Sequence, residues 1–336
     1  MATFIIAEAG VNHNGNVAIA RKLIDAAAAA GADAVKFQTF KAANLASVDA
    51  PKAIYQQASD NNESQREMLE GLELNHEEHQ ELASHCDNRG IAFLSTAFGL
   101  TELELLLRLN ISAIKVPSGE ITHRPLLEAM AAAAFNRKLP VYLSTGMSNL
   151  GDVEAALQLF LDAGLLRNQI TLLHCLSAYP APEDQINLRA LLTLASAFGC
   201  PVGYSDHTLG IIAPVAAVAL GAVLIEKHLT LDTCSTGPDH KASLEPKEFK
   251  AMVAAIRSCE QMLGDGRKLP QPAEQNTLHV ARRSIRAARP IEIYSRFTDD
   301  DFICQRPADG QSPMLYHQLL GKQATRSYEP GELIDG

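Results

Sequence analysis

Residues 202–243 read VGYSDHTLGIIAPVAAVALGAVLIEKHLTLDTCSTGPDHKAS, and the stretch contains two short apolar runs that each lead into a histidine. The run 202–204 leads into His207 and the run 222–225 into His228, so each histidine lies where a predicted strand ends. Neutral imidazoles on adjacent strand ends are good ligands for a divalent transition metal. A single strand-end histidine more often bonds a neighbouring loop, whereas two in consecutive units predict a metal site. Nearby side chains could add ligands or proton-transfer groups: Asp206, Glu226, Asp239 and His240.

The alternation of strand and helix extends outward from this stretch over the first 264 residues. Apolar runs predict strands at 4–8, 34–38, 91–95, 113–116, 141–144, 170–175, 202–204 and 222–228. Helical patterns fall at 18–30, 76–88, 100–109, 125–134, 152–163, 187–198, 211–220 and 246–263. Eight such units predict a parallel (β/α)8 barrel.

Polar clusters follow almost every predicted strand, which is where a barrel collects its catalytic groups. A doubly wound open sheet is the competing architecture, but it would concentrate polar groups at one switch point. The glycine-rich GxGxxG loop that usually accompanies such a sheet does not follow the first strand. The barrel is therefore the preferred fold. The clusters are Glu8, 36–39, 95–96, 115–120, 144–147, His174, 205–207 and 226–228.

Alternation of side chains along a strand indicates which residues face the barrel interior. Glu226 and His228 share a face, which turns Lys227 toward the helices and makes it a poor Schiff-base lysine. Lys36 and Lys115 are expected to face inward, where a buried charge needs an anion. Together with three serines they predict a cradle for phosphate or carboxylate; the alternative is that each lysine pairs with a structural carboxylate. The serines are Ser118, Ser144 and Ser205.

Composition limits the class of protein. The 336 residues carry a formal charge of −10 and no lysine- or arginine-rich block, which argues against a nucleic-acid or anionic-membrane surface. No apolar run approaches the roughly 20 residues of a membrane span. No basic, apolar leader precedes the first predicted strand, so a cytoplasmic protein is expected. The six scattered cysteines suit a reducing compartment and are interpreted as small core residues.

Three domain-level features follow from the pattern along the chain. The polar segment 40–65 is too long for an ordinary connection and is interpreted as an active-site loop. Residues 1–264 form the predicted barrel, and the Gly- and Pro-rich residues 265–276 a linker. Residues 277–336 then form a small C-terminal block, whose short apolar runs between turns indicate compact β-rich structure.

Ten ordered motifs spread over almost the whole chain resemble the sialic acid synthase family, which includes N-acetylneuraminate synthases and their legionaminic acid relatives. The motifs are IIAEAGVNHNG (5–15), GADAVKFQTFKA (31–42), KVPSGEIT (115–122), LSTGM (143–147), LLHC (172–175), YPAP (179–182), VGYSDHTLG (202–210), EKHLTLD (226–232), GPDHKASLEP (237–246) and QRPADGQSPM (305–314).

The resemblance implies a (β/α)8 barrel followed by a C-terminal domain like type III antifreeze protein, the SAF domain. It also implies a domain-swapped homodimer that condenses phosphoenolpyruvate with an N-acylated mannosamine-type sugar. One motif departs from the family: the turn after the first SAF strand reads RPIEIYSR (289–296) and lacks the usual glycine. That departure leaves the geometry of this turn open.

Site roles carry over by motif. His207 and His228 would hold a divalent metal, manganese or magnesium, near the sugar aldehyde. Catalytic roles fall to Glu120, as the proton-transfer carboxylate, and to Glu8, Lys115 and Asp239; Glu8, Asp239 and Tyr179 would also meet the sugar or the intermediate. Arg306 would reach the N-acyl group of the sugar from the partner subunit. The phosphoenolpyruvate site would be lined by Lys36, Gln38, Lys115, Ser118, Ser144 and Ser205.

The motifs leave the identity of the sugar substrate open. N-acetylmannosamine is the preferred candidate substrate, and the expected activity is then that of an N-acetylneuraminate synthase. Two alternative substrates are N-acetylmannosamine 6-phosphate and a 2,4-diacetamido-2,4,6-trideoxy analogue, as in legionaminic acid synthesis. The KFQTFK form (36–41) is closer to the sialic and legionaminic branches than to the pseudaminic one. Two remote alternatives from other classes are a Schiff-base aldolase, testable by borohydride trapping, and a non-catalytic glycan-binding protein, which would release no phosphate with any sugar.

Overall fold

The computed structural model describes residues 2–53, 55–56 and 64–335. The chain divides into two compact units, 1–264 and 265–336. The first unit alternates strand and helix as the sequence predicts, with boundaries within about three residues of those expected. Its elements are β1 (Phe4–Gly10), α1 (Val17–Ala30), β2 (Ala34–Thr39), α2 (Ala42–Leu45), α3 (Gln65–Glu70), α4 (His76–Arg89), β3 (Ala92–Ala97), α5 (Leu100–Arg108), β4 (Ile114–Val116), α6 (Arg124–Arg137), β5 (Val141–Ser144), α7 (Leu150–Asp162), β6 (Ile170–Cys175), α8 (Ala190–Phe198), β7 (Val202–Asp206), α9 (Ile212–Ala219), β8 (Leu224–His228) and α10 (Pro246–Leu263).

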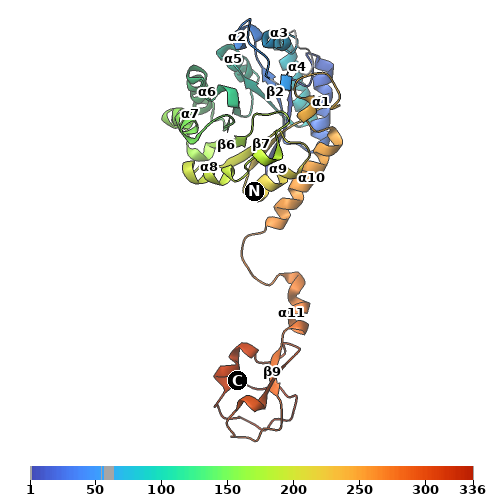
Figure 1. Ribbon diagram of the computed structural model, residues 1–336, viewed down its shortest axis with the longest axis vertical. Helices are drawn as coiled ribbons and strands as arrows, with labels where there is room; N and C mark the ends of the chain where they lie inside the picture. Colours follow the sequence, from blue (N-terminus) through green and yellow to red (C-terminus); the bar gives the residue numbers. More distant parts are fainter. Residues whose placement is uncertain (1, 54, 57–63, 336) are drawn as a thin grey trace. The chain divides into compact units, whose positions relative to one another are not determined.

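The eight strands form one parallel sheet in the order β3-β2-β1-β8-β7-β6-β5-β4. The first and last strands are therefore neighbours, and Glu8 on β1 lies opposite His228 on β8. The two ends of the ladder, β3 and β4, lie next to each other, although no paired residues join them in the described part of the chain. Helices surround the strands (Figure 1). The predicted (β/α)8 barrel is confirmed.

Local signals set the ends of the helices. The Asn16 side chain accepts hydrogen bonds from the first turn of α1, and Gly31 ends that helix in the left-handed conformation, with φ of 86°. Asn75 and Glu78 form a reciprocal capping box at the start of α4. The main core lies between the strands and the helices and consists of aliphatic side chains such as Ile5, Val35 and Leu172, all fully buried.

The segment 40–65 differs from the irregular loop that the sequence predicts. It contains the short helix α2, and a capping box between Ser64 and Glu67 begins α3 at its far end. Part of the predicted loop, Ile54 and residues 57–63, lies outside the described residues. Helices this short have too few periodic apolar positions to be recognised from sequence.

The second unit contains α11 (Gln275–Ala281), β9 (Ser284–Ala287), β10 (Phe302–Gln305) and α12 (Tyr316–Leu319). The two strands pair antiparallel, and isolated bridges such as Ile291 to Tyr328 extend this small β structure. In the turn 289–296, which lacks the usual glycine, Tyr294 adopts a left-handed φ of 68°. The backbone thus reaches the conformation that glycine favours, at the expense of placing a tyrosine there. The described helices include none that is both long and apolar enough to cross a membrane.

Candidate active site

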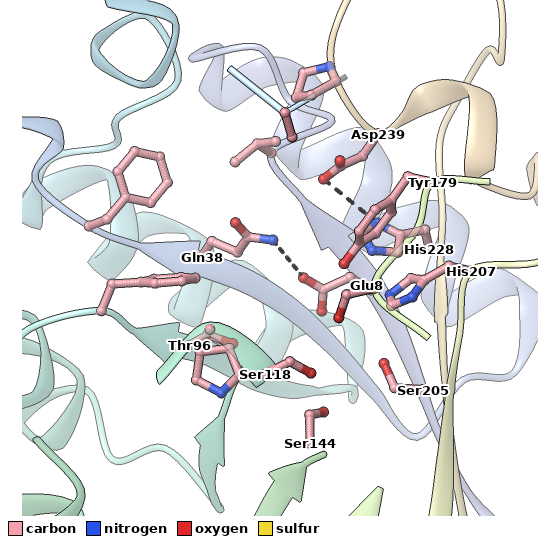
Figure 2. A pocket seen from close by; sticks show the side chains of 18 of the residues that line it. Glu8, Gln38, Thr96, Ser118, Ser144, Tyr179, Ser205, His207, His228 and Asp239 are labelled. Atoms are coloured by element: carbon pink, nitrogen blue, oxygen red, sulfur yellow. Dashed lines mark hydrogen bonds and ion pairs between the residues drawn. The ribbon is translucent and has the colours of Figure 1, made fainter. Parts of the chain in front are cut away.

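A cavity of about 470 Å³ opens at the carboxyl ends of the strands, where a barrel places its chemistry. Ten of its lining residues are labelled in Figure 2. Strand alternation explains which side chains point into the barrel, because residues two apart on a strand share a face. Three such pairs point inward: Lys36 with Gln38, Ser205 with His207, and Glu226 with His228. The predicted site residues that line it are Glu8, Lys36, Gln38, Lys115, Ser118, Glu120, Ser144, Tyr179, Ser205, His207, His228 and Asp239.

The floor of the cavity is a buried network of two lysines and two carboxylates. The Lys36 ammonium pairs with Glu8 and lies 3.6 Å from an oxygen of Glu226, and the Lys115 ammonium lies 3.4 Å from the other oxygen of Glu226. Both lysines therefore have carboxylate partners, as the alternative interpretation of the sequence proposed. They also line the cavity next to hydroxyl groups, because Lys36 donates to Thr96 at 2.9 Å and Lys115 to Ser144 at 2.6 Å.

The two carboxylates in this network differ in protonation. Burial alone would raise the pKa of Glu226, but the charges of Lys115 and Lys36 outweigh it and hold that pKa at about 2. Burial raises the pKa of Glu8 to about 7, because Lys36 offsets it only in part and the Glu226 charge adds to it. Glu226 is thus a fixed anion between two cations. Glu8 can gain or lose a proton near neutral pH, as a general acid or base requires.

The two histidines at the ends of β7 and β8 lie side by side, with ring centres 5.4 Å apart. His207 donates its Nδ1 proton to the carbonyl of Leu176 at 2.7 Å, which leaves Nε2 as its lone-pair nitrogen. The His228 Nδ1 is buried and has no hydrogen-bond partner among the described residues, and the nearest Asp239 oxygen is 4.0 Å away. Figure 2 shows both histidines gathered with Tyr179 and Asp239.

This donor set fits a metal with open coordination positions. Burial holds the pKa of His228 well below its usual value, so its imidazole is neutral, the form that binds a metal. Burial would also lower the pKa of His207, but contacts with Cys175 and the Leu176 carbonyl raise it, so a metal would compete with a proton there. The described residues hold no cluster of three or more His, Cys, Asp or Glu side chains arranged as metal ligands. Two imidazoles would leave the remaining positions to substrate or water oxygens.

Asp239 is held over this site by the loops that follow β1 and β8. The Asn12 amide donates to Ser243 at 2.8 Å and to the Leu229 carbonyl at 2.9 Å, and Ser243 donates to the Asp239 carbonyl at 2.7 Å. Burial raises the pKa of Asp239 to about 6. Asn12 therefore helps to position the loop that carries Asp239.

Aromatic stacking covers the histidine pair. The Tyr179 ring lies 4.1 Å from the His207 ring and meets His228 edge-on, and the Tyr55 ring lies 4.8 Å from Tyr179. Burial raises the pKa of Tyr179 well above its usual value, so its hydroxyl stays protonated. Tyr55 belongs to the predicted active-site loop, and the described parts of that loop do line the cavity.

Two predicted residues lie away from the floor of the cavity. Glu120 is on the 3-10 turn after β4, where it lines the cavity but pairs with His123 at 2.6 Å. Arg306 belongs to the second unit, where it follows β10 and is exposed. Lys227, set aside as a Schiff-base candidate, is fully buried and bonds Asp206 at 2.6 Å. It is absent from the described cavity lining.

Sequence reasoning missed the central position of Glu226, which it named only as a possible ligand or proton carrier. The signal was present, since Glu226 precedes His228 by two residues on the same face. It also interpreted all six cysteines as core residues. This was wrong for Cys234, which is exposed; Cys175 is buried as expected, but it also lines the cavity, 3.4 Å from Ser118. Cys175 is the last residue of β6, so it faces the same opening as the other strand ends.

Comparisons with known proteins show the family to which the chain belongs. The NeuB family model matches residues 23–268, and the SAF domain model matches residues 282–336. The N,N'-diacetyllegionaminic acid synthase of Campylobacter jejuni is 49% identical over 99% of this chain and 98% of its own. The enzyme of the same name from Legionella pneumophila is 42% identical, over 99% of this chain and 94% of its own.

A solved structure shows the same fold. The N-acetylneuraminic acid (sialic acid) synthetase of Leptospira borgpetersenii, in complex with citrate, is 35% identical with a TM-score of 0.72, covering 83% of this chain and 90% of its own. The SAF match confirms the antifreeze-like fold expected for the C-terminal block. The chain therefore belongs to the NeuB family, the sialic acid synthase family that its motifs predicted, and it is an enzyme of that family with a C-terminal SAF domain.

Proposed function

We propose that this enzyme condenses phosphoenolpyruvate with an N-acylated mannosamine-type sugar and water, giving a nine-carbon 2-keto acid and phosphate. One observation carries the proposal: the lysine and serine floor and the histidine pair line a single cavity, with Glu8 paired to Lys36 on β2 and opposite His228 on β8. The floor suits an anionic phosphate ester. The histidine pair suits activation of an aldehyde next to it.

Among the possible sugars we propose 2,4-diacetamido-2,4,6-trideoxymannose, which makes the enzyme a legionaminic acid synthase. The sequence alone placed N-acetylmannosamine first. Two relatives that span nearly the whole chain are named as N,N'-diacetyllegionaminic acid synthases, which supports ranking the trideoxy sugar ahead of N-acetylmannosamine. N-acetylmannosamine stays as the second candidate.

The side chains of the cavity account for the steps of this reaction. Lys36, Lys115 and the hydroxyls of Ser118, Ser144 and Ser205 would hold the phosphate and carboxylate of phosphoenolpyruvate. A manganese or magnesium ion held by His207 and His228 would supply Lewis-acid polarisation of the sugar aldehyde. The methylene carbon of phosphoenolpyruvate then attacks the aldehyde carbon and leaves positive charge on the carbon that bears phosphate. The carboxylates of Glu8 and Glu226 stabilise that charge.

Proton transfer completes the reaction. Water adds to the cationic carbon, and Asp239, whose pKa burial raises to about 6, can accept its proton. The tetrahedral intermediate then expels phosphate by cleavage of its carbon–oxygen bond, with the lysines stabilising the departing anion. The former aldehyde oxygen must gain a proton to become a hydroxyl, and Glu8 is better placed than Glu120 to donate it, because Glu8 lies in the floor with a pKa of about 7 while Glu120 bonds His123.

A phosphate-release assay with phosphoenolpyruvate, manganese and each sugar tests this proposal. Fastest release is expected with the 2,4-diacetamido-2,4,6-trideoxy sugar, followed by N-acetylmannosamine. Release with neither sugar would contradict the condensation. A covalent pyruvyl adduct trapped by borohydride would instead favour a Schiff-base aldolase.

Lys115→Ala should raise the apparent KM for phosphoenolpyruvate by about tenfold to 100-fold, the usual effect of losing a charged hydrogen bond of about 1.5–3 kcal/mol. The KM for the sugar should change little, since Lys115 contacts Ser144 and Glu226 on the floor. Steady-state kinetics with each substrate varied in turn measure both values. Equal increases in the two KM values would remove Lys115 from the phosphate cradle.

We further propose that Arg306 contacts the N-acyl group of the sugar from the partner subunit of a homodimer. Arg306→Ala should then weaken sugar binding by about 1–3 kcal/mol and leave phosphoenolpyruvate binding nearly unchanged. Mixing Arg306→Ala chains with His228→Ala chains tests the exchange, because a swapped heterodimer keeps one barrel with its own histidine and an intact partner arginine. Confirmed subunit exchange without recovered activity would contradict the contribution in trans.

A further inference from the structure

The cavity has an apolar wall that the reaction steps do not use. Its residues come from the segment after β2, from α2 and α3, and from the residue after β3. All of them pack in one small cluster, separate from the main core, and the rings of Phe40 and Phe98 meet edge to face at 6.1 Å. The apolar wall consists of Phe40, Leu45, Met68, Leu69, Leu72 and Phe98, all of which line the cavity.

Two aromatic rings of the same cavity stack next to the histidine pair. Tyr55, in the same segment of chain as the wall, stacks on Tyr179, and Tyr179 stacks on His207. A sugar whose aldehyde carbon lies at the histidines has the rest of its carbon chain to place in the same cavity, which the two tyrosines and the apolar wall also line. The far carbons of the sugar therefore meet apolar side chains.

The charge of the lining limits which substituents those carbons can carry. Among the described lining residues, Lys36 and Lys115 are the only lysines or arginines, and both belong to the floor and pair with carboxylates. The described lining residues from 53–56 and 64–65 are neutral: Ala53, Tyr55, Gln56 and Gln65. Among the described lining residues, a phosphate on the far end of the sugar would meet no cation of its own there.

We infer that the apolar wall selects a sugar that carries methyl groups, a 6-deoxy carbon above all, where N-acetylmannosamine carries hydroxyls. A hydroxyl buried against this wall loses its hydrogen bonds to water, whereas a methyl group gains contacts there. A 6-phosphate adds a charge without a counter-ion and is rejected more strongly. This inference rests on the proposed function, and it assigns the specificity of the sugar site to named side chains.

The expected preference is moderate. An apolar pocket discriminates by about 10-fold to 200-fold against a one-group difference of this kind. For two sugars that differ only at C6, 2,4-diacetamido-2,4,6-trideoxymannose and its 6-hydroxy counterpart, wild-type kcat/KM should favour the deoxy sugar by a factor within this range. Turnover of N-acetylmannosamine 6-phosphate should be lower than that of either.

Leu45→Gln and Leu69→Gln test the wall, because a side-chain amide offers the 6-hydroxyl a hydrogen-bond partner. Each change should reduce the preference for the deoxy sugar by about tenfold, with the KM for phosphoenolpyruvate unchanged. Leu192→Gln is the matched control, because Leu192 is an exposed leucine on α8 outside the cavity lining. That variant should keep the wild-type preference, and circular dichroism should show that all three proteins fold.

The outcomes separate this inference from the proposed function. If wild-type enzyme releases no phosphate with any of these sugars, the proposed condensation is wrong. If it turns over the sugars without preferring the deoxy compound, the condensation stands and the wall inference is overturned. An unchanged preference in both folded glutamine variants would also overturn it, because the selectivity would then reside elsewhere.

Discussion

Replacing Lys227 with methionine should lower the free energy of unfolding by about 3–5 kcal/mol, the usual cost of breaking a buried ion pair from one side. Lys227 and Asp206 are both fully buried, and their charged atoms lie 2.6 Å apart. Methionine fills much of the same volume, so the loss comes mainly from the Asp206 charge, which keeps its bonds from Thr208 but loses its cation. Urea denaturation followed by circular dichroism measures the change.

A double variant provides the control. Asp206→Asn combined with Lys227→Met removes both charges and should recover much of the lost stability, because an asparagine can accept the Thr208 N–H bond through its oxygen and donate its amide to the Thr208 hydroxyl. Equal destabilisation in the single and double variants would show that packing, not the unpaired charge, sets the cost. The same pair also joins the ends of β7 and β8, one residue before each histidine. A weaker affinity for manganese in Lys227→Met should accompany the stability loss.

Chelation with EDTA should abolish turnover, and added manganese or magnesium should restore it, because nothing else in the described lining can polarise the aldehyde as strongly. His228→Ala should lose turnover in the same way, and added manganese or magnesium should not restore it. Its ring makes no hydrogen bond through Nδ1 among the described residues, so the barrel should keep its fold. Isothermal titration with manganese should show weakened binding in this variant.

The matched comparison is His174→Ala, because His174 is a strand-end histidine whose ring bonds the Ile186 carbonyl at 2.7 Å. It lies outside the described cavity lining, so manganese binding should persist in that variant. Full turnover by His228→Ala in metal-free buffer would contradict the proposal that a metal held by His207 and His228 is required. Unaltered manganese affinity in His228→Ala would remove this histidine from the ligand set.

Much of the barrel could be predicted because its signals are local. Apolar strands, capped helices and glycines at helix ends repeat along the first 264 residues, and a parallel barrel is the simple way to bury eight such units. Strand alternation also indicated which of Lys36, Glu226 and Lys227 face inward. The two short helices after β2 were missed, since four and six residues are too few to show a helical period.

The partners inside the site could not be predicted from sequence. Strand ends show that Lys36, Lys115 and Glu226 approach the same opening, but only the register between strands decides that one carboxylate reaches both lysines. The contrast between Glu8 and Glu226 follows from that geometry, since each has a different set of cations around it. The apolar wall was hidden for a similar reason, because its residues are adjacent only after the segment folds back over the barrel mouth.

The pairing of β1 with β8 has a consequence for how the chain is made. Glu8 and His228 are opposite each other in the sheet but 220 residues apart in sequence (228 − 8 = 220). During synthesis, the first strand emerges with one hydrogen-bonding edge open, and it stays unpaired there until the last barrel strand leaves the ribosome. An amino-terminal fragment that ends before β8 therefore lacks His228 and Glu226. Lys36 and Lys115 then lack the carboxylate that they share in the complete barrel. The active site comes into being only when the ring closes, so nascent chains depend on rapid late closure or on protection of that open edge.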